Sequence, residues 1–203
     1  ALLVEFQENS EENLDQTVAR FTQQLPEFYL IEEPQFTKDA KQQAFYWKVR
    51  KGLFPAVGAV RASGTTVILE DVAFPVAHLG QAIIDIQGLF QKFNYLNGII
   101  FGHAKDGNIH FVVTQAFDSP EEIRRYDLFI RDVVDLVVNK YKGSLKAEHG
   151  TGRNMAPFVA TEWGEEAYEI MKRLKKAVDP KNLLNPGVII NDKTDAHIHH
   201  LKK

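Results

Sequence analysis

The sequence predicts an α+β fold in which helices pack on one face of a mainly antiparallel sheet. Runs rich in β-branched residues alternate with amphipathic helical patterns, and their predicted order over residues 1–142 is β-α-β, helix, β-α-β-β-α. This order is typical of the ferredoxin-like split βαβ arrangement. An Asp106-Gly107 pair between two β-prone runs also predicts a hairpin, which joins antiparallel strands.

The first part of the chain predicts two strands and two helices. Residues 2–6 are β-prone, and Ser10 can cap a helix whose apolar residues share one face. The apolar run 28–31 lies between prolines and predicts a second strand. A helix is then expected from about Asp39 to Leu53, because Pro55 should end it.

The central part predicts three strands and two helices. Residues 65–74 are rich in β-branched side chains and predict a strand. Apolar residues at steps of three and four predict a helix over 79–90. Strands are expected at 99–103 and 109–114, and a helix from Ser119 to about Tyr141 begins with a cap, a proline and a capping-box acid.

The pattern changes after residue 142. Strand patterns stop at Gly143, and the clearest remaining helix is predicted at Glu165–Val178. We therefore divide the chain into a ferredoxin-like domain, 1–142, and a C-terminal helical segment, 143–203. Because the sequence begins directly on a strand-like run without an initiator methionine, we expect it to be cut from a longer protein.

Composition excludes several classes of function. The 203 residues are 44% hydrophobic and 25% charged, which is typical of one globular domain or two small ones. The net charge of −3 gives no global field for nucleic acid, and no apolar run is long enough to cross a bilayer. Without a signal-peptide pattern, the chain is expected to be cytoplasmic. Since there is no cysteine, a metal site must use His, Asp or Glu.

The densest functional pattern is the segment Phe101–Phe111, FGHAKDGNIHF. A two-residue turn at Asp106-Gly107 would place His103 directly opposite His110 on one face of the hairpin. Their imidazoles could then reach one metal ion, although two histidines on a hairpin also occur as a plain surface pair. A longer loop would shift this register.

A second pattern, Lys146–Asn154 (KAEHGTGRN), could complete such a site. Glu148 is a candidate third ligand, because catalytic zinc takes three protein ligands and an open position. His149 could face that position as a general base, and the glycines at 150 and 152 would let the backbone turn around a ligand.

Arginines and further histidines complete the set of candidates. Arg50 and Arg153 could each bind a substrate carboxylate in a bidentate manner, although arginines in such positions are more often surface or salt-bridge residues. His197, His199 and His200 lie in a basic tail, which we expect to be solvated. The sequence contains no GxGxxG, Walker or HExxH motif.

Three motifs together resemble a known family. GHAKDGNIH, AEHGTGR and the DPKNLLNPG of residues 179–187 resemble the C-terminal cap domain of FAD-linked oxidases of the vanillyl-alcohol-oxidase class, in the order found there. That class includes D-lactate, glycolate and D-2-hydroxyglutarate dehydrogenases. The LEDVAFP of residues 69–75 looks most like large bacterial proteins in which an FAD domain, this cap and an iron–sulfur domain follow one another.

The resemblance implies a role for each matching residue. It implies a divalent ion, usually zinc, at His103, His110 and Glu148, and a base near the flavin at His149. It implies a substrate-carboxylate contact at Arg50, to which we add Arg153, and a contact with the flavin ring edge at Asn185.

The implied function is the substrate- and metal-binding part of an FAD-dependent D-2-hydroxy acid dehydrogenase. FAD would be held mainly by another domain, against which residues 143–203 would pack, and the isolated fragment would be inactive. Lys105 stands where the usual family motif has glycine, and Val112 and Leu69 differ from the hydroxyglutarate-type pattern. The implied substrate is therefore a D-2-hydroxy acid and no narrower class. A metal hydrolase built on the same three ligands, and a ferredoxin-like binding module without catalysis, are the alternatives.

Overall fold

A computed structural model describes residues 1–201 and divides the chain into two compact units. The first unit is Ala1–Ala56 and the second begins at Val57. The C-terminal segment 143–201 lies within the second unit, and its packing against a further domain stays a prediction. No helix in the described part of the chain combines the length and the apolar character needed to span a bilayer.

The first unit contains helix α1 (Glu11–Gln24) and most of helix α2 (Ala40–Val60). As expected, Ser10 caps α1, because its hydroxyl accepts a hydrogen bond from the amide of Asn13. Phe6, Phe21 and Phe36 form a small aromatic cluster with ring centroids 5.3–6.1 Å apart. This cluster gives the first unit a small apolar centre of its own.

Three sequence predictions for the first unit are wrong. Residues 2–6 and 28–31 are not strands, because no strand within residues 1–201 pairs with either run, and both leave large side chains in solvent. Tyr29 and Ile31 are more than 90% exposed. Helix α2 also continues through Pro55 to Val60, because an internal proline removes one hydrogen bond without compelling the remaining turns to unwind.

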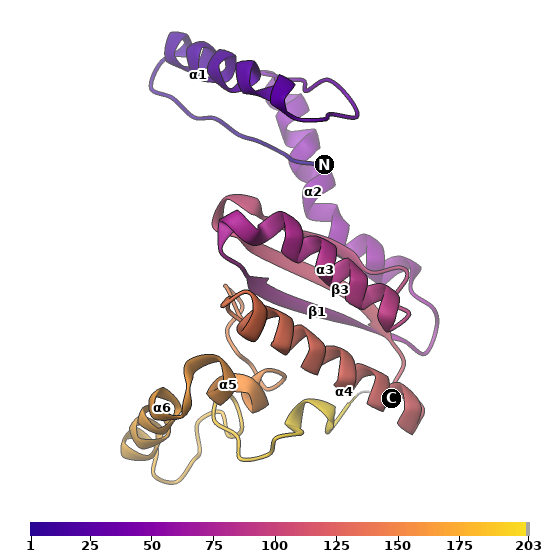
Figure 1. The fold of residues 1–203 in the computed structure, drawn as a ribbon, viewed down its shortest axis with the longest axis vertical. Coiled ribbons are helices and arrows are strands. Elements are labelled where there is room, and N and C mark those ends of the chain that lie inside the picture. The colour runs from indigo at the N-terminus through magenta and orange to yellow at the C-terminus, as the bar shows by residue number, and fades with distance from the viewer. Residues whose placement is uncertain (202–203) are drawn as a thin grey trace. The chain divides into compact units, whose positions relative to one another are not determined.

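The second unit is built on a three-stranded antiparallel sheet. Its strands are β1 (Thr66–Ala73), β2 (Ile99–His103) and β3 (Asn108–Gln115), in the order β1-β3-β2. Helix α3 (Leu79–Lys92) connects β1 to β2, and α4 (Pro120–Val134) follows β3 and continues as a π-helical segment to Lys140. Both helices lie on the same side of the sheet (Figure 1). The predicted α+β class is confirmed.

Strand alternation gives the two faces of the sheet different chemistry. One face holds Phe111, which packs against Phe90 of α3 and Phe129 of α4 with ring centroids 5.8 Å apart in each pair. The opposite face carries the neighbouring residue of β3, His110, beside Asp71 of β1. The aromatic core therefore fixes the strands from one side and leaves the polar side chains on the other.

The hairpin between β2 and β3 differs in register from the sequence prediction. His103 pairs with Asn108 and Phe101 pairs with His110, so the loop has four residues, 104–107, instead of two. Gly107 takes the left-handed conformation (φ +67°), and its carbonyl accepts a hydrogen bond from the amide of Phe74. Because this register differs from the predicted one by two residues, both histidines stay on one face.

The segment after α4 runs along the outer edge of β1. Ala73 and Ser144 exchange two backbone hydrogen bonds of 2.9 Å, and the amide of Ala147 donates to the carbonyl of Asp71 at 3.4 Å. These bonds place the next residues, Glu148 and His149, beside the polar face of the sheet. Helices α5 (Val159–Trp163) and α6 (Glu165–Val178) follow, the latter as predicted.

The C-terminal tail is partly buried, contrary to the expectation of a solvated segment. The side chain of His197 is inaccessible to solvent, and its Nε2 lies 2.7 Å from Oδ1 of Asp127 on α4. The ring also packs against Phe158 at a centroid distance of 5.0 Å. Burial lowers the pKa of His197, more strongly than the nearby Asp127 carboxylate raises it. His199 and His200 are exposed as predicted.

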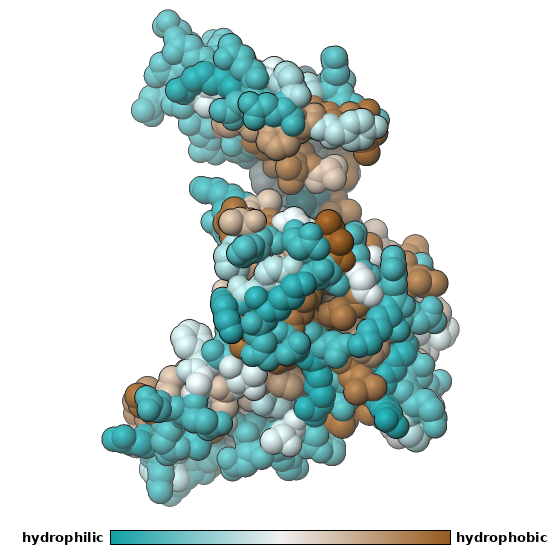
Figure 2. All heavy atoms as spheres, in the orientation of Figure 1, coloured by the Kyte–Doolittle hydropathy of each residue, from teal (hydrophilic) through white to brown (hydrophobic). Residues whose placement is uncertain are grey.

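An apolar stripe is exposed on α6 and in the loop that follows it. Ile170, Leu174 and Val178 lie four residues apart on the helix, and each is more than 60% exposed. Leu183 and Leu184 extend this stripe into the loop. Figure 2 shows further apolar residues as brown patches between polar, teal areas of the surface. We call Ile170, Leu174, Val178, Leu183 and Leu184 together the α6 stripe.

We predict that Gly107→Ala destabilises the fold strongly. A methyl group at Gly107 would overlap the carbonyl oxygen of Phe74 and would occupy the left-handed region, so the free energy of unfolding should fall by roughly 2–5 kcal/mol. Gly64→Ala is the matched control, because Gly64 has φ +82° with open space around it, and it should cost about 1–2 kcal/mol. Urea unfolding measures both, and equal losses would contradict the close approach at Gly107.

We also predict that His197 makes the fold sensitive to acid. Its pKa in the folded protein is below the ordinary 6.5, so its contribution to stability is complete above pH 6.5 and is lost as the pH falls below that value. His197→Gln keeps a neutral polar group there. The unfolding free energy of the variant should therefore fall less steeply below pH 6.5 than that of the original protein. If the unfolding free energies of the two proteins fell equally steeply below pH 6.5, His197 would be excluded as a source of the acid sensitivity.

Candidate metal and substrate site

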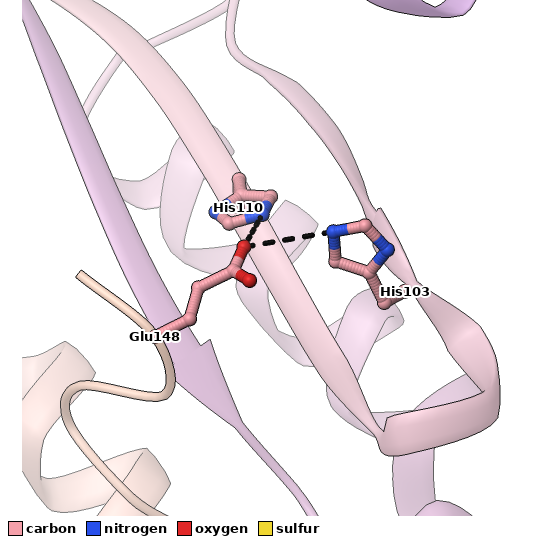
Figure 3. Close-up of side chains that lie close together, drawn as sticks. All are labelled: His103, His110 and Glu148. Atoms are coloured by element: carbon pink, nitrogen blue, oxygen red, sulfur yellow. Dashed lines mark ion pairs between the residues drawn. The ribbon is translucent and has the colours of Figure 1, made fainter. Parts of the chain in front are cut away.

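The structure brings together three predicted ligands on the polar face of the sheet. One potential ligand atom from each of His103, His110 and Glu148 lies within 4.8 Å of the other two. Glu148 Oε1 is 2.9 Å from His110 Nε2 and 3.5 Å from His103 Nε2 (Figure 3). His103 ends β2, His110 lies in β3, and Glu148 reaches them from the loop after α4. We call these three residues the His–His–Glu group.

The group is buried on one side and open on the other. The side chain of His110 is 5% exposed, whereas those of His103 and Glu148 are about half exposed, at 51% and 49%. A pocket of ≈ 470 Å³ adjoins the group. It is lined by Ala73, His103, Asp106, Asn108, Ser144, Lys146, Ala147 and Glu148. A small molecule could therefore approach the group from this pocket.

His149 lies directly beside the group. Its ring stacks on that of His110 with a centroid distance of 4.9 Å and an interplanar angle of 16°. Its Nε2 is 3.7 Å from Glu148 Oε1, and its side chain is 45% exposed. An accessible imidazole therefore stands next to the position where the three candidate ligands converge.

A buried carboxylate, Asp71 in β1, supports the whole arrangement. Its Oδ2 accepts hydrogen bonds from the backbone amides of Glu148 (2.7 Å) and His149 (2.8 Å). Its Oδ1 accepts a hydrogen bond of 2.5 Å from Nδ2 of Asn108 and lies 3.6 Å from Nδ1 of His110. Asp71 is inaccessible to solvent. It therefore contacts the loop and the sheet at the same time.

The surroundings shift the pKa values of both Asp71 and His110. Burial alone would raise the pKa of Asp71, but the amides of Glu148, His149 and Asn108 together hold it below its usual range. Burial lowers the pKa of His110 and outweighs the opposite effect of the Asp71 and Glu148 carboxylates. Asp71 is thus the ionised partner in the buried pair, and His110 favours the neutral form that binds metals.

The donor set fits zinc better than magnesium or calcium. Two imidazole nitrogens and one carboxylate oxygen form the three-ligand set of a catalytic zinc site, whereas magnesium and calcium prefer oxygen alone. His110 Nδ1 is buried, has no hydrogen-bond partner in the described part of the chain, and lies 3.6 Å from Asp71 Oδ1. A histidine that binds a metal through Nε2 commonly directs Nδ1–H toward a carboxylate in this way.

The remaining predicted site residues lie outside the His–His–Glu group. Arg50 is half-buried on α2 in the first unit, and Arg153 is exposed in the loop that also holds Gly150 and Gly152. Asn185 is exposed in the turn after α6 with φ +46°. The carboxylate of Asp179 holds that turn by accepting hydrogen bonds from the amides of Leu183 (2.9 Å) and Leu184 (2.8 Å).

Three residues near the group were absent from the sequence prediction. Asp71 and Asn108 contact its members, and Lys146 lines the pocket while pairing with Glu70 at 2.5 Å on the other face of the sheet. One sequence feature could have indicated Asp71, namely the acidic pair Glu70-Asp71 within a strand rich in β-branched residues. Acidic residues are rarely buried unless they have partners, so this pair indicates nearby donors. The sequence does not indicate which partners satisfy them.

Comparison with known proteins identifies a family match over most of the chain. The model of the family of FAD-linked oxidases, C-terminal domain, matches residues 1–189. The match includes every predicted site residue.

Curated relatives carry the names of oxidases and dehydrogenases of hydroxy acids. The chain is 31% identical to glycolate oxidase subunit GlcD of Bacillus subtilis over 65% of this chain and 28% of that protein. It is 31% identical to the mitochondrial D-lactate dehydrogenase (cytochrome) of Arabidopsis thaliana over 81% of this chain and 27% of the relative. The mitochondrial D-2-hydroxyglutarate dehydrogenase of the same plant is 25% identical over 93% of this chain and 32% of the relative. The chain thus spans less than a third of these relatives.

Proposed function

The chain belongs to the family of C-terminal domains of FAD-linked oxidases, and we propose that it forms the substrate- and metal-binding part of an FAD-dependent D-2-hydroxy acid dehydrogenase. The convergence of His103, His110 and Glu148 beside His149 is the observation that carries this proposal. Glycolate, D-lactate and D-2-hydroxyglutarate, which appear in the names of the relatives, share one reacting group, a hydroxyl next to a carboxylate.

The proposed cofactors are FAD and a divalent metal, with zinc as the expected ion. His103 and His110 would bind the metal through nitrogen and Glu148 through oxygen. When bound, the metal would favour loss of the proton from the hydroxyl of a chelated 2-hydroxy acid, and FAD would accept the two electrons of the oxidation. The metal would act on the hydroxyl oxygen and FAD on the C–H bond of the same carbon, so the substrate would lie between this chain and the flavin.

Within this chain, the proposed base is His149. Its accessible imidazole would accept the substrate hydroxyl proton at the open side of the His–His–Glu group. The C–H hydrogen would leave with its electron pair to FAD, and the product would be the 2-oxo acid. Arg50 and Arg153 are the proposed contacts for the substrate carboxylate, and Asn185 the proposed contact for the flavin edge. The assignments of Arg50 and Asn185 follow from the resemblance of their motifs, and that of Arg153 from its place in the glycine loop.

The proposed partner is an FAD-binding domain of the same protein, docked on residues 143–203. The α6 stripe supports this, because five large apolar residues exposed together are typical of a surface that another domain covers. Asn185 directly follows the stripe, so docking there would bring it toward the flavin domain. The fragment alone is expected to be inactive, since the proposed reaction needs the flavin.

The iron–sulfur partner domain and the cytoplasmic location remain predictions from the sequence. No comparison supports the iron–sulfur domain, and both Arabidopsis relatives are named as mitochondrial proteins. The chain itself contains no cysteine. An electron relay through cysteine-bound clusters would therefore have to lie outside these residues.

The metal assignment predicts one zinc ion per chain. His110→Ala removes the most buried ligand, so zinc affinity should fall at least about 100-fold, since a three-ligand site loses one of its donors. His199→Ala is the matched control, because His199 is an exposed histidine outside the group. Competition with a chromophoric chelator measures both variants. Equal zinc affinity of the two would contradict the site and would favour the non-catalytic binding module.

The catalytic assignment predicts that His149→Gln slows oxidation of D-lactate or D-2-hydroxyglutarate by about 100- to 10,000-fold, the usual contribution of a general base. The assay uses the full-length protein with FAD and a dye acceptor. Zinc affinity should change little, because His149 is not one of the three ligands. An undiminished rate would remove His149 from the mechanism. Hydrolase activity of these 203 residues without FAD would instead support the metal-hydrolase alternative.

A further inference from the structure

We propose that Asp71 is the positioning residue of the site, which orients His110 and fixes the backbone of Glu148 and His149 so that ligand and base converge. This inference deepens the proposed function and rests on it. Asp71 is not a candidate ligand, because its two oxygens face donors of the protein. Its effect on a metal or substrate would be transmitted through the residues that it holds.

The backbone contacts explain how Glu148 reaches the sheet. Glu148 and His149 are 77 and 78 positions from Asp71 in the chain, yet both of their amides donate to the same oxygen, Oδ2. Two consecutive amides on one carboxylate oxygen fix the direction of the backbone between them. The side chain of Glu148 then extends from that backbone toward Nε2 of His110 and Nε2 of His103 (Figure 3). The ring of His149 stacks on that of His110 and stays 45% exposed.

The contact with His110 explains the choice of ring nitrogen. Oδ1 of Asp71 lies 3.6 Å from Nδ1, on the side of the ring opposite to Nε2, which faces Glu148 at 2.9 Å. A carboxylate on that side favours the tautomer with the proton on Nδ1 and leaves the Nε2 lone pair for a metal. Asn108 holds Oδ1 in this position with its amide group.

The donor pattern requires a carboxylate and excludes its amide analogue. Both oxygens of Asp71 accept hydrogen bonds: Oδ2 from two backbone amides and Oδ1 from the amide of Asn108, and Oδ1 also lies 3.6 Å from His110 Nδ1. An asparagine side chain has one oxygen and one NH₂ group. In either orientation, its NH₂ would meet donors, so Asp71→Asn must release either the loop or the histidine.

Asp179 provides a matched control within the same chain. It is also buried, and its carboxylate also accepts hydrogen bonds from two consecutive backbone amides, those of Leu183 and Leu184. It pairs with Lys175 at 2.5 Å and is not part of the His–His–Glu group. Asp179→Asn therefore makes the same chemical change in the same kind of loop, without touching the site.

The test compares zinc affinity of the full-length protein with Asp71→Asn and with Asp179→Asn. Asp71→Asn should weaken zinc binding by about 10- to 100-fold, the usual effect of removing a partner that orients a metal ligand. The visible spectrum of the Co²⁺-loaded protein should change as well. Asp179→Asn should leave the affinity and the spectrum unchanged. Equal affinities and spectra for both variants would overturn the proposal.

Amide hydrogen exchange without metal separates this proposal from the metal assignment itself. Exchange should accelerate at Glu148 and His149 in Asp71→Asn, and at Leu183 and Leu184 in Asp179→Asn, whereas a general loss of stability would accelerate both loops in both variants. The original protein could bind no zinc while each variant still accelerates exchange only in its own loop. In that case the metal assignment fails, and the positioning of the Glu148–His149 loop by Asp71 stands. If neither pattern appears, the positioning role is overturned.

A second variant covers the case in which Asp71→Asn does not fold. Asn108→Ala removes the donor that fixes Oδ1 of Asp71 beside His110 and leaves the carboxylate in place. Zinc affinity should fall, by less than in Asp71→Asn, and exchange at Glu148 and His149 should stay close to that of the original protein. Unchanged zinc affinity in Asn108→Ala would overturn the orienting role toward His110.

Discussion

The site depends on one buried interaction, the carboxylate of Asp71 with the backbone amides of Glu148 and His149. A carboxylate without access to solvent is costly unless donors surround it, and here the donors come from strand β3 and from a loop distant in sequence. The requirement to satisfy this charge therefore closes the loop onto the sheet. Without that closure, the two histidines would have no third ligand beside them.

The aromatic core allows the polar face to carry this function. Phe90, Phe111 and Phe129 pack on the helix side of the sheet, so the strand positions do not depend on the site side chains. On the same rigid framework, Ala73 and Ser144 join the loop to the edge of β1. The outer ends of the site remain open, with His103, Glu148 and His149 about half exposed. A rigid sheet together with solvent-accessible side chains suits a site that binds a small acid.

The sequence predicted the central elements because their signals are local. The strands and helices over 65–141 and the helix 165–178 follow from periodicity and capping, and the grouping of His103, His110 and Glu148 followed from motifs. The predicted hairpin register was wrong by two residues, which changed the partner of His110 but not its face. The strands expected at 2–6 and 28–31 failed because pairing is not a local property. Asp71 was missed for the same reason, since its partners lie 77 and 78 residues away.

The most direct test of the central claim is anomalous X-ray diffraction at the zinc edge from crystals of the zinc-loaded, full-length protein. The account predicts one peak bound by Nε2 of His103, Nε2 of His110 and a carboxylate oxygen of Glu148, at distances of about 2.0–2.2 Å. It also predicts that Asp71 binds no metal and keeps its hydrogen bonds to the amides of Glu148 and His149. The absence of a peak among these three residues, or a peak bound directly by Asp71, would contradict the account.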